Sequence, residues 1–308
     1  MDAHPSESAA GGVLSVVREF VKAMRPVQWV KNVFVFAPLV FGLRLLDTPS
    51  LGLAAVAFSL FCLVSSAVYL LNDLMDRHHD ARHPTKRFRP IASGRLPVEV
   101  ARAGIALLLA AGVFGALAFD WRVALVLGGY FALNAGYSLQ LKHYAFIDIA
   151  CIATGFLLRV LAGGFAIAVP VSGWLLACTF LLASLLALGK RKHELLAVAQ
   201  NGRAPGTRAV LDRYRVHHID WTLRVLSVVT VASYALYTLS ETTVAHFGTR
   251  GLVLSVPFVA IGLWRFFRLV AEHAEAQSPT DTMVRDVPFL LNVGAWAVVV
   301  TATIYFRW

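Results

Sequence analysis

The sequence has few cysteines and lacks the residue patterns from which zinc sites and nucleotide-binding loops are built. Its three cysteines, Cys62, Cys151 and Cys178, lie inside apolar runs without a CxxC spacing, so we expect neither a disulfide nor a thiolate metal site. The sequence has no HExxH pair, P-loop or GxGxxG segment, which argues against zinc, nucleoside triphosphate and dinucleotide chemistry. Charged residues make up only 15% of the chain, against about 25% in a typical soluble domain.

Long apolar runs dominate instead. Hydrophobic residues make up 58% of the 308 residues, and the runs recur along nearly the whole chain. This pattern predicts an all-α, polytopic membrane protein with nine transmembrane helices. We expect the spans near residues 25–46, 51–71, 98–119, 123–139, 147–168, 173–188, 219–239, 251–267 and 289–305.

The segment before the first span has two parts. Residues 1–12 are polar and contain glycine, without a basic stretch before an apolar one, so we expect a disordered tail and no cleaved signal peptide. Residues 13–24 have a basic amphipathic pattern, which predicts a helix lying on the membrane surface. We therefore expect a single transmembrane domain over residues 13–308.

The basic residues concentrate on one predicted side of the membrane. The formal net charge is +10, but these residues lie between apolar spans and not on a soluble face, so no nucleic-acid partner is expected. If nine spans alternate, about 21 of the 28 Lys and Arg residues share one side with the N-terminus and only three lie on the other. The positive-inside rule then places the polar loops and any active site in the cytoplasm, at the inner membrane of a bacterial-type cell.

The segment 72–97, which follows the second span, has the pattern of a metal–phosphate site. Asn72, Asp76 and Asp80 are four residues apart and Asp73 lies beside them, so a continuing helix would bring them to one face. Carboxylates this close repel one another unless a cation neutralises them. Mg²⁺ suits such a site, because it takes oxygen ligands and shares its coordination shell with phosphates. We predict that Asp73, Asp76 and Asp80 bind Mg²⁺ and act in catalysis.

The same segment is rich in cations. They suit direct contact with phosphates, and they are Arg77, Arg82, Lys86, Arg87, Arg89 and Arg95. The alternative is a solvated loop that obeys the positive-inside rule. That alternative explains the Lys and Arg residues but not the regular acidic spacing, so we favour a Mg²⁺–diphosphate site.

The spacing Asn72-x-x-x-Asp76-x-x-x-Asp80 resembles the first acidic motif of the UbiA superfamily of intramembrane prenyltransferases. The string HPTKRFRPIASG, residues 83–94, resembles more specifically the decaprenyl-phosphate phosphoribosyltransferase branch of that superfamily. The resemblance covers nearly the whole chain. It implies a helical bundle that encloses a lipid-accessible cavity, and it implies that Lys86, Arg87 and Arg89 bind substrate together with Asn72.

Two more elements are similar to family motifs. RPVQWVKN, residues 25–32, resembles the family's RPxQWxKN opening and implies substrate contact by Lys31 and Asn32; snorkelling anchors at the membrane surface are the alternative. Tyr137 and Lys142 alone would be an interfacial aromatic residue and a cytosolic cation, but they resemble a Y-x-x-x-x-K element of the family, which implies that Lys142 is a phosphate ligand. Asp148 either orients Lys142 or simply starts the next helix.

Arg159 lies roughly 17 Å into the fifth predicted span by helical rise. Asp148, at the mouth of that span, is its only carboxylate, so the partner of Arg159 must come from another helix, a cavity or an anionic substrate. We favour the substrate.

The segment GKRKHE, residues 189–194, follows the sixth span. The resemblance predicts a second acidic motif here in ordinary UbiA prenyltransferases, but this chain has Lys190, Arg191 and Glu194 in a mostly basic segment. Such a segment suits an additional phosphate, such as the 5-phosphate of phosphoribosyl pyrophosphate. A cluster that only obeys the positive-inside rule is the alternative.

The resemblance thus implies Mg²⁺-dependent transfer of 5-phosphoribose from phosphoribosyl pyrophosphate to a polyprenyl phosphate, with release of pyrophosphate. One alternative is a conventional prenyltransferase that moves a polyprenyl chain from its diphosphate to an aromatic acceptor, and the missing second acidic motif argues against it. A non-enzymatic lipid-phosphate carrier is another, but the sequence has no inverted repeat or pair of broken helices.

Overall fold

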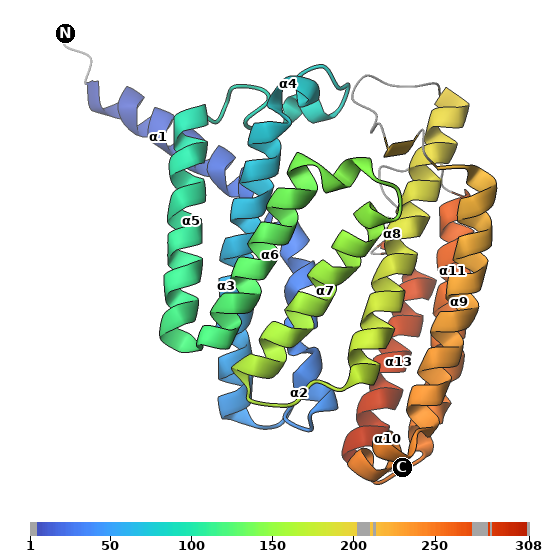
Figure 1. The fold of residues 1–308 in the computed structure, drawn as a ribbon. Helices are drawn as coiled ribbons and strands as arrows, with labels where there is room; N and C mark the ends of the chain where they lie inside the picture. The colour runs from blue at the N-terminus through green and yellow to red at the C-terminus, as the bar shows by residue number, and fades with distance from the viewer. Residues whose placement is uncertain (1–4, 202–209, 212–213, 273–282, 284, 307–308) are drawn as a thin grey trace.

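The structure, a computed structural model, describes residues 5–201, 210–211, 214–272, 283 and 285–306, and all regular structure in these ranges is helical. The long helices lie side by side in an elongated bundle (Figure 1). In chain order they are α1 (Pro5–Met24), α3 (Thr48–Met75), α5 (Val98–Phe119), α6 (Trp121–Leu139), α7 (Ile147–Ala166), α8 (Gly173–Asn201), α9 (Val216–Leu239), α11 (Val256–Glu272) and α13 (Val287–Phe306). The shorter elements are η1 (Pro26–Phe36), α2 (Ala37–Phe41), α4 (Arg77–Asp80), η2 (Lys86–Phe88), η3 (Leu141–His143), α10 (Glu241–Phe247) and η5 (Gly251–Ser255).

Within the described ranges, seven helices are long and apolar enough to cross a membrane, and they make the chain an integral membrane protein. They correspond to α3, α5, α7, the first part of α8, α9, η5 with α11, and α13. The remaining two predicted spans coincide with α6 and with η1–α2. The count of nine crossings stays a prediction.

The segment Pro26–Phe41 is shorter than an ordinary spanning helix, but its geometry extends its reach. Its first 11 residues form the 3-10 helix η1, and a 3-10 helix rises about 2.0 Å per residue where an α-helix rises about 1.5 Å. Together η1 and α2 therefore reach about 30 Å, close to the thickness of a bilayer's hydrocarbon core. Periodicity alone gave no indication of the 3-10 geometry.

The N-terminal helix differs from the sequence-based prediction. α1 begins at Pro5 and not near residue 13, so residues 5–12 are helical where we expected a disordered tail. Proline at a first helical position and small or acidic residues behind it are compatible with a helix start. Residues 1–4 lie outside the described ranges.

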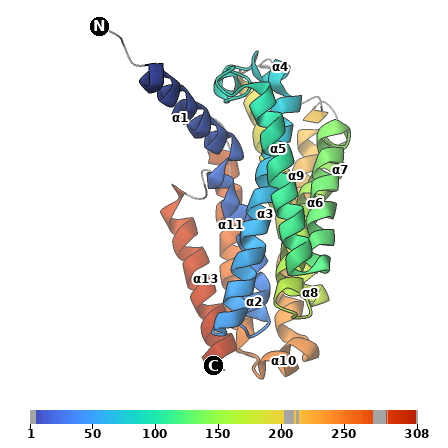
Figure 2. The same cartoon turned by 90° about the vertical axis from the view of Figure 1, so that its left-hand side faces the viewer.

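The polar segments predicted to share one side do gather at one end of the bundle. In Figure 1, α4, the start of α5 and the ends of α6 and α8 lie at the upper end, whereas α10 and the C-terminus lie at the lower end. Figure 2 shows the same separation and also shows α1 leaning away from the bundle at the upper end. The second polar loop, predicted to open at GKRKHE and to reach residue 218, is shorter than expected, because α8 continues as a helix to Asn201 and α9 already begins at Val216. Residues 202–209 and 212–213 between these helices lie outside the described ranges.

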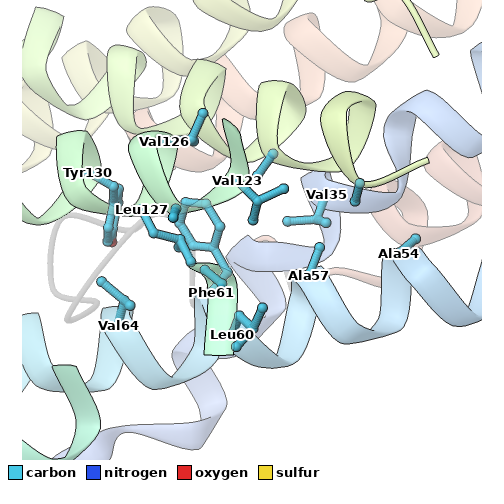
Figure 3. Packing of buried hydrophobic residues seen from close by; sticks show 14 of the residues in the cluster. Val35, Ala54, Ala57, Leu60, Phe61, Val64, Val123, Val126, Leu127 and Tyr130 are labelled. Atoms are coloured by element: carbon cyan, nitrogen blue, oxygen red, sulfur yellow. The ribbon is translucent and has the colours of Figure 1, made fainter. Parts of the chain in front are cut away.

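One half of the bundle is held together by a core between η1, α3, α6 and α7. Phe61 of α3 is fully buried at its centre, with Val35 of η1 and Leu127 of α6 around it (Figure 3). The ring of Phe61 also contacts the edge of Tyr130, with centroids 4.8 Å apart. A second core joins α8, α9 and α11, and α7 contributes Ile149 to it. The two cores fix α7 between the halves of the bundle.

Close packing of η1 on α7 depends on Gly163. A Cβ atom at this position would lie 1.9 Å from the carbonyl oxygen of Val35, so only glycine permits the approach. We expect Gly163→Ala to destabilise the protein by about 1–3 kcal/mol through overpacking, measured as thermal unfolding in detergent. Gly128→Ala is the matched control, because a Cβ atom there meets nothing within 4 Å. Equal losses in both variants would contradict this account.

The orientation in the membrane gives a second prediction. Ser93, in the segment between α4 and α5, and Thr242, in α10, are both exposed. In Figure 1, α4 and the start of α5 lie at the opposite end of the bundle from α10. Because of the basic-residue bias, we expect Ser93→Cys to react with a membrane-impermeant maleimide only from the cytoplasmic side and Thr242→Cys only from the outside. The background protein would have its three native cysteines replaced by serine. Labelling of both positions from one side would refute the predicted topology.

Candidate functional site

The acidic motif, Asn72, Asp73, Asp76 and Asp80, lies where α3 gives way to α4. The backbone N–H of Asp76 donates to the carbonyl of Asn72 at 2.9 Å, and that of Asp80 donates to the carbonyl of Asp76 at 2.8 Å. The motif residues thus keep i to i−4 hydrogen bonds with one another, although α3 ends at Met75 and α4 begins at Arg77. Asp73 and Asp80 are buried, with 2% and 4% of their surface exposed, whereas Asp76 is partly exposed.

Two arginines neutralise the buried carboxylates. Arg89 donates through Nη1 to Asp80 Oδ2 at 2.6 Å and to Asp73 Oδ1 at 3.1 Å. Arg25 donates to the same oxygen of Asp73. Arg25 joins α1 to η1 in the left-handed backbone conformation (φ 53°) that L-residues seldom adopt. This turn ends α1 beside the site, so the RPVQWVKN motif contributes a cation to the acidic motif.

The other two members of the motif contact the end of α6 and the turn that follows it. Lys142 of η3 pairs with Asp76, with Nζ and Oδ1 2.9 Å apart. Ser138 of α6 donates its hydroxyl to Asn72 Oδ1. Elements separated by more than sixty residues in sequence thereby meet at the motif. The role of Lys142 as a phosphate ligand stays a prediction.

The string HPTKRFRPIASG positions Arg89 by anchoring its own loop. Ile91 and Leu96 are buried in a cluster with residues of α1, α3 and α5, so apolar contacts with these helices fix the loop. Gly94 takes a left-handed conformation (φ 75°) between them. His83 Nδ1 accepts from the backbone N–H of Thr85 at 3.2 Å, and burial with nearby Lys86 lowers the pKa of His83 below its usual range, which keeps this nitrogen available as an acceptor.

The carboxylates of the acidic motif are the groups that could hold a divalent cation. Within the described ranges no three His, Cys, Asp or Glu side chains gather as a metal-binding group. Asp73 and Asp80, however, direct one oxygen each at a single cationic nitrogen of Arg89, and Asp76 follows Asp73 by one turn. Carboxylate oxygens converging on one position suit Mg²⁺, so the donor set fits in kind, with Asp76 turned towards Lys142.

Arg159 is buried deep in the bundle among neutral partners. It donates to Asn32 Oδ1 at 2.8 Å, to the carbonyl of Gly155 at 2.7 Å and to Tyr130 Oη at 3.0 Å. Its guanidinium also lies 4.8–5.2 Å from the ring centroids of Phe61, Tyr130 and Phe156. Among the described residues no carboxylate pairs with Arg159. Asn32, predicted to contact substrate, is itself buried against Arg159, Cys62 and Ser65.

A second buried network lies where α8 passes α7. Arg191 is 1% exposed and donates to Asp148 Oδ2 and to Glu194 Oε2, both at 2.7 Å. Its third nitrogen donates to Tyr137 Oη at 3.4 Å. Tyr214 completes the group by donating to Asp148 Oδ1 at 2.6 Å. The predicted site residues Tyr137, Arg191 and Glu194 are thus brought together by Asp148.

The remaining predicted cations lie nearer the surface. Lys31, Lys86 and Lys190 are partly buried, and Arg87 is exposed and stacks on Phe88 at 4.8 Å. Sequence reasoning omitted Arg25, Ser138 and Tyr214 from the site and left the role of Asp148 open. Arg25 lies within a motif we had singled out, and Asp148 is a rare carboxylate at the mouth of a span, so both had a usable signal. Ser138 and Tyr214 had none.

The sequence matches a known protein family. Residues 33–283 match the UbiA prenyltransferase family. The chain belongs to this family. Decaprenyl-phosphate phosphoribosyltransferase of Corynebacterium glutamicum is 35% identical over 291 residues, which cover 92% of this chain and 86% of that protein. The protein of the same name in Mycolicibacterium smegmatis is 33% identical over 321 residues, covering 99% of this chain and 100% of that one.

A solved UbiA structure shares the fold. The UbiA homolog of Archaeoglobus fulgidus bound to DMAPP and Mg²⁺ superposes with a TM-score of 0.67 at 18% identity, covering 93% of this chain and 99% of that chain. This agreement extends over almost the whole bundle. The UbiA fold therefore includes the N-terminal half with the acidic motif as well as the C-terminal half with α8 and α9.

The shared contact of Arg89 with two carboxylates gives a prediction about metal affinity. If Asp73 and Asp80 hold Mg²⁺ as predicted, the ion competes with Arg89 for the same oxygens, so we expect Arg89→Gln to bind Mg²⁺ alone about tenfold more tightly, or about 1.4 kcal/mol. The measurement is a Mg²⁺ titration of purified protein by calorimetry, without substrates. Arg102→Gln, which removes an exposed arginine paired with Glu99 on α5, is the control. Unchanged or weaker Mg²⁺ binding by Arg89→Gln would show that Arg89 does not occupy a metal position.

Proposed function

We propose that this UbiA-family chain transfers 5-phosphoribose from phosphoribosyl pyrophosphate to a polyprenyl phosphate. The observation that carries the proposal is the identity of 33–35% with decaprenyl-phosphate phosphoribosyltransferases over nearly the full chain. The site chemistry supports it. Arg25, Arg89 and Lys142 surround the acidic motif, and Lys190 lies one position before the buried Arg191. A donor with a diphosphate and a further phosphate needs such a number of cations.

Mg²⁺ is the cofactor we propose, with Asp73, Asp76 and Asp80 as the residues that would hold it. It supplies positive charge for the donor diphosphate and for the pyrophosphate that leaves. The solved UbiA homolog with bound Mg²⁺ supports this assignment, as do the carboxylate oxygens converging on Arg89.

The side chains of this site bind, orient and neutralise. In the proposed reaction an oxygen of the lipid phosphate attacks C1 of the ribose, and the bond from C1 to the pyrophosphate oxygen breaks with its electron pair leaving on pyrophosphate. The lipid phosphate is ionised near neutral pH, so no side chain is required as a base. Arg25, Arg89 and Lys142 would exchange their carboxylate contacts for phosphate contacts, and Lys86, Arg87, Lys190 and Lys31 would supply further charge at the rim.

The membrane supplies one substrate and the cytoplasm the other. The polar end of the bundle carries the acidic motif, and the basic-residue bias directs that end to the cytoplasm, where a sugar phosphate is available. A polyprenyl phosphate would approach from the bilayer. The inner membrane of a bacterial-type cell is the proposed location.

The test is transfer of label from phosphoribosyl pyrophosphate to polyprenyl phosphate by purified protein in detergent with Mg²⁺. We expect the wild type to form labelled lipid, EDTA to stop it and added Mg²⁺ to restore it. Asp80→Asn should lose at least about a hundredfold in kcat/KM, or about 2.7 kcal/mol of transition-state stabilisation, because it removes a buried carboxylate of the acidic motif.

Glu99→Gln is the control for this experiment, because Glu99 is an exposed carboxylate on α5 that pairs only with Arg102 among the described residues. It should retain full activity. Turnover of a prenyl diphosphate with an aromatic acceptor, and none with phosphoribosyl pyrophosphate, would favour the conventional prenyltransferase and overturn the proposal.

A further inference from the structure

Arg191 is the largest fully buried side chain of the described bundle, and its contacts leave no surface for a ligand. Its three nitrogens donate to Asp148, Glu194 and Tyr137, and its ion pair with Asp148 joins two side chains with 1% and 0% of their surface exposed. Removing one partner of such a pair leaves a buried charge uncompensated. The neighbouring Lys190 is only partly buried. The two adjacent cations of GKRKHE therefore have different surroundings, although the sequence made them equivalent phosphate ligands.

Asp148 also binds Tyr214. Its second oxygen accepts the hydroxyl proton of Tyr214 at 2.6 Å, so both carboxylate oxygens are occupied. Tyr214 precedes α9, and burial together with the hydrogen bond to Asp148 raises its pKa well above the usual range. The hydroxyl thus stays protonated and keeps donating to Asp148 at any ordinary pH.

The same hydroxyl fixes the turn between α6 and α7. Tyr214 Oη accepts the backbone N–H of Phe146 at 2.8 Å, and the rings of the two residues make an edge contact at 5.4 Å between centroids. Phe146 has φ 65°, a conformation that is costly for a bulky L-residue and persists only where surrounding contacts determine it. Tyr214 supplies the contact that holds it.

This turn carries Lys142. The residues from Leu141 to His143 form η3, and the backbone N–H of Asp148 donates to the carbonyl of Tyr144 at 3.1 Å, which ties the turn to α7. Lys142 Nζ lies 2.9 Å from Asp76 Oδ1 in the acidic motif. A continuous series of polar contacts therefore runs from α8 through Asp148 and Tyr214 to the turn that presents Lys142.

We propose that Arg191, Asp148 and Tyr214 are positioning residues that hold the 140–146 turn so that Lys142 meets the donor phosphates beside Asp76. The inference rests on the proposed function for its kinetic consequences. It reassigns Arg191 from a phosphate ligand to a residue that acts through Lys142.

The experiment uses Tyr214→Phe, which removes one hydroxyl and keeps the ring. We expect KM for phosphoribosyl pyrophosphate to rise about five- to tenfold while kcat and the KM for lipid phosphate change less than twofold. In a Lys142→Ala background the same substitution should have no further effect, because the residue through which it acts is already gone. An undiminished effect of Tyr214→Phe in that background, or no effect on the donor KM in the wild-type background, would overturn the proposal.

Tyr305→Phe is a closely matched control. Tyr305 Oη also accepts a backbone N–H, that of Leu45 at 3.0 Å, and donates to the carbonyl of Leu39 at 3.2 Å, but it lies on α13 near the C-terminus. Its loss should affect stability in a comparable way and leave the donor KM unchanged. A similar rise of KM in Tyr305→Phe would show that general loosening of the bundle explains both variants.

A second measurement does not depend on the reaction. In Tyr214→Phe we expect hydrogen–deuterium exchange at the Phe146 amide and across residues 140–147 to be at least tenfold faster than in the wild type, with no change there in Tyr305→Phe. Unchanged exchange would overturn the positioning role even if the enzyme is active. Failure of the wild type to transfer phosphoribose, with faster exchange in Tyr214→Phe, would instead refute the proposed function and leave the structural role of Tyr214 established.

Discussion

The structure of the polar end depends on neutralising two buried carboxylates, Asp73 and Asp80. A carboxylate in a low-dielectric interior costs several kcal/mol unless a cation lies against it, and these two lie close enough to share Arg89. Arg25 contributes the second positive charge from the junction of α1 and η1. The demand for charge balance thereby brings the N-terminal helix and the 82–95 loop to the end of α3. Apolar packing of Ile91 and Leu96 fixes the loop that carries Arg89.

The same charge balance explains how the site is prepared for an anionic substrate. In the protein alone, each carboxylate of the acidic motif is paired with a cation of the chain. Under the proposed function, the divalent cation would pair with the carboxylates, and the phosphates bound to it would pair with Arg25, Arg89 and Lys142. Each charged group would then exchange its present partner for a new one. Because neither set of groups is left uncompensated, the exchange avoids the penalty of an isolated buried charge. This is a physical basis for requiring both the metal and the phosphates together.

The sequence contained the acidic motif and most of the long helices, because four-residue spacing and apolar length are local properties. The geometry of η1 could not be predicted from the sequence, because apolar periodicity does not distinguish a 3-10 helix from an α-helix over so short a segment. The sequence also did not indicate that Lys190 and Arg191 have different surroundings. Which of two adjacent cations faces the core depends on the rotation of α8, and the partners of Arg191, Asp148 and Tyr137, lie 43 and 54 residues earlier in the chain. Tyr214 carries no local signal at all.

The mostly basic segment at the end of α8 has a structural consequence beyond its charge. Because α8 continues as a helix through GKRKHE, adjacent residues point in different directions. Arg191 turns inward to Asp148, and Lys192 turns to Asp220 of α9 at 2.8 Å. Two of the three Lys and Arg residues thus hold α8 against α7 and α9. The basic character of this segment therefore serves first to join helices inside the membrane protein.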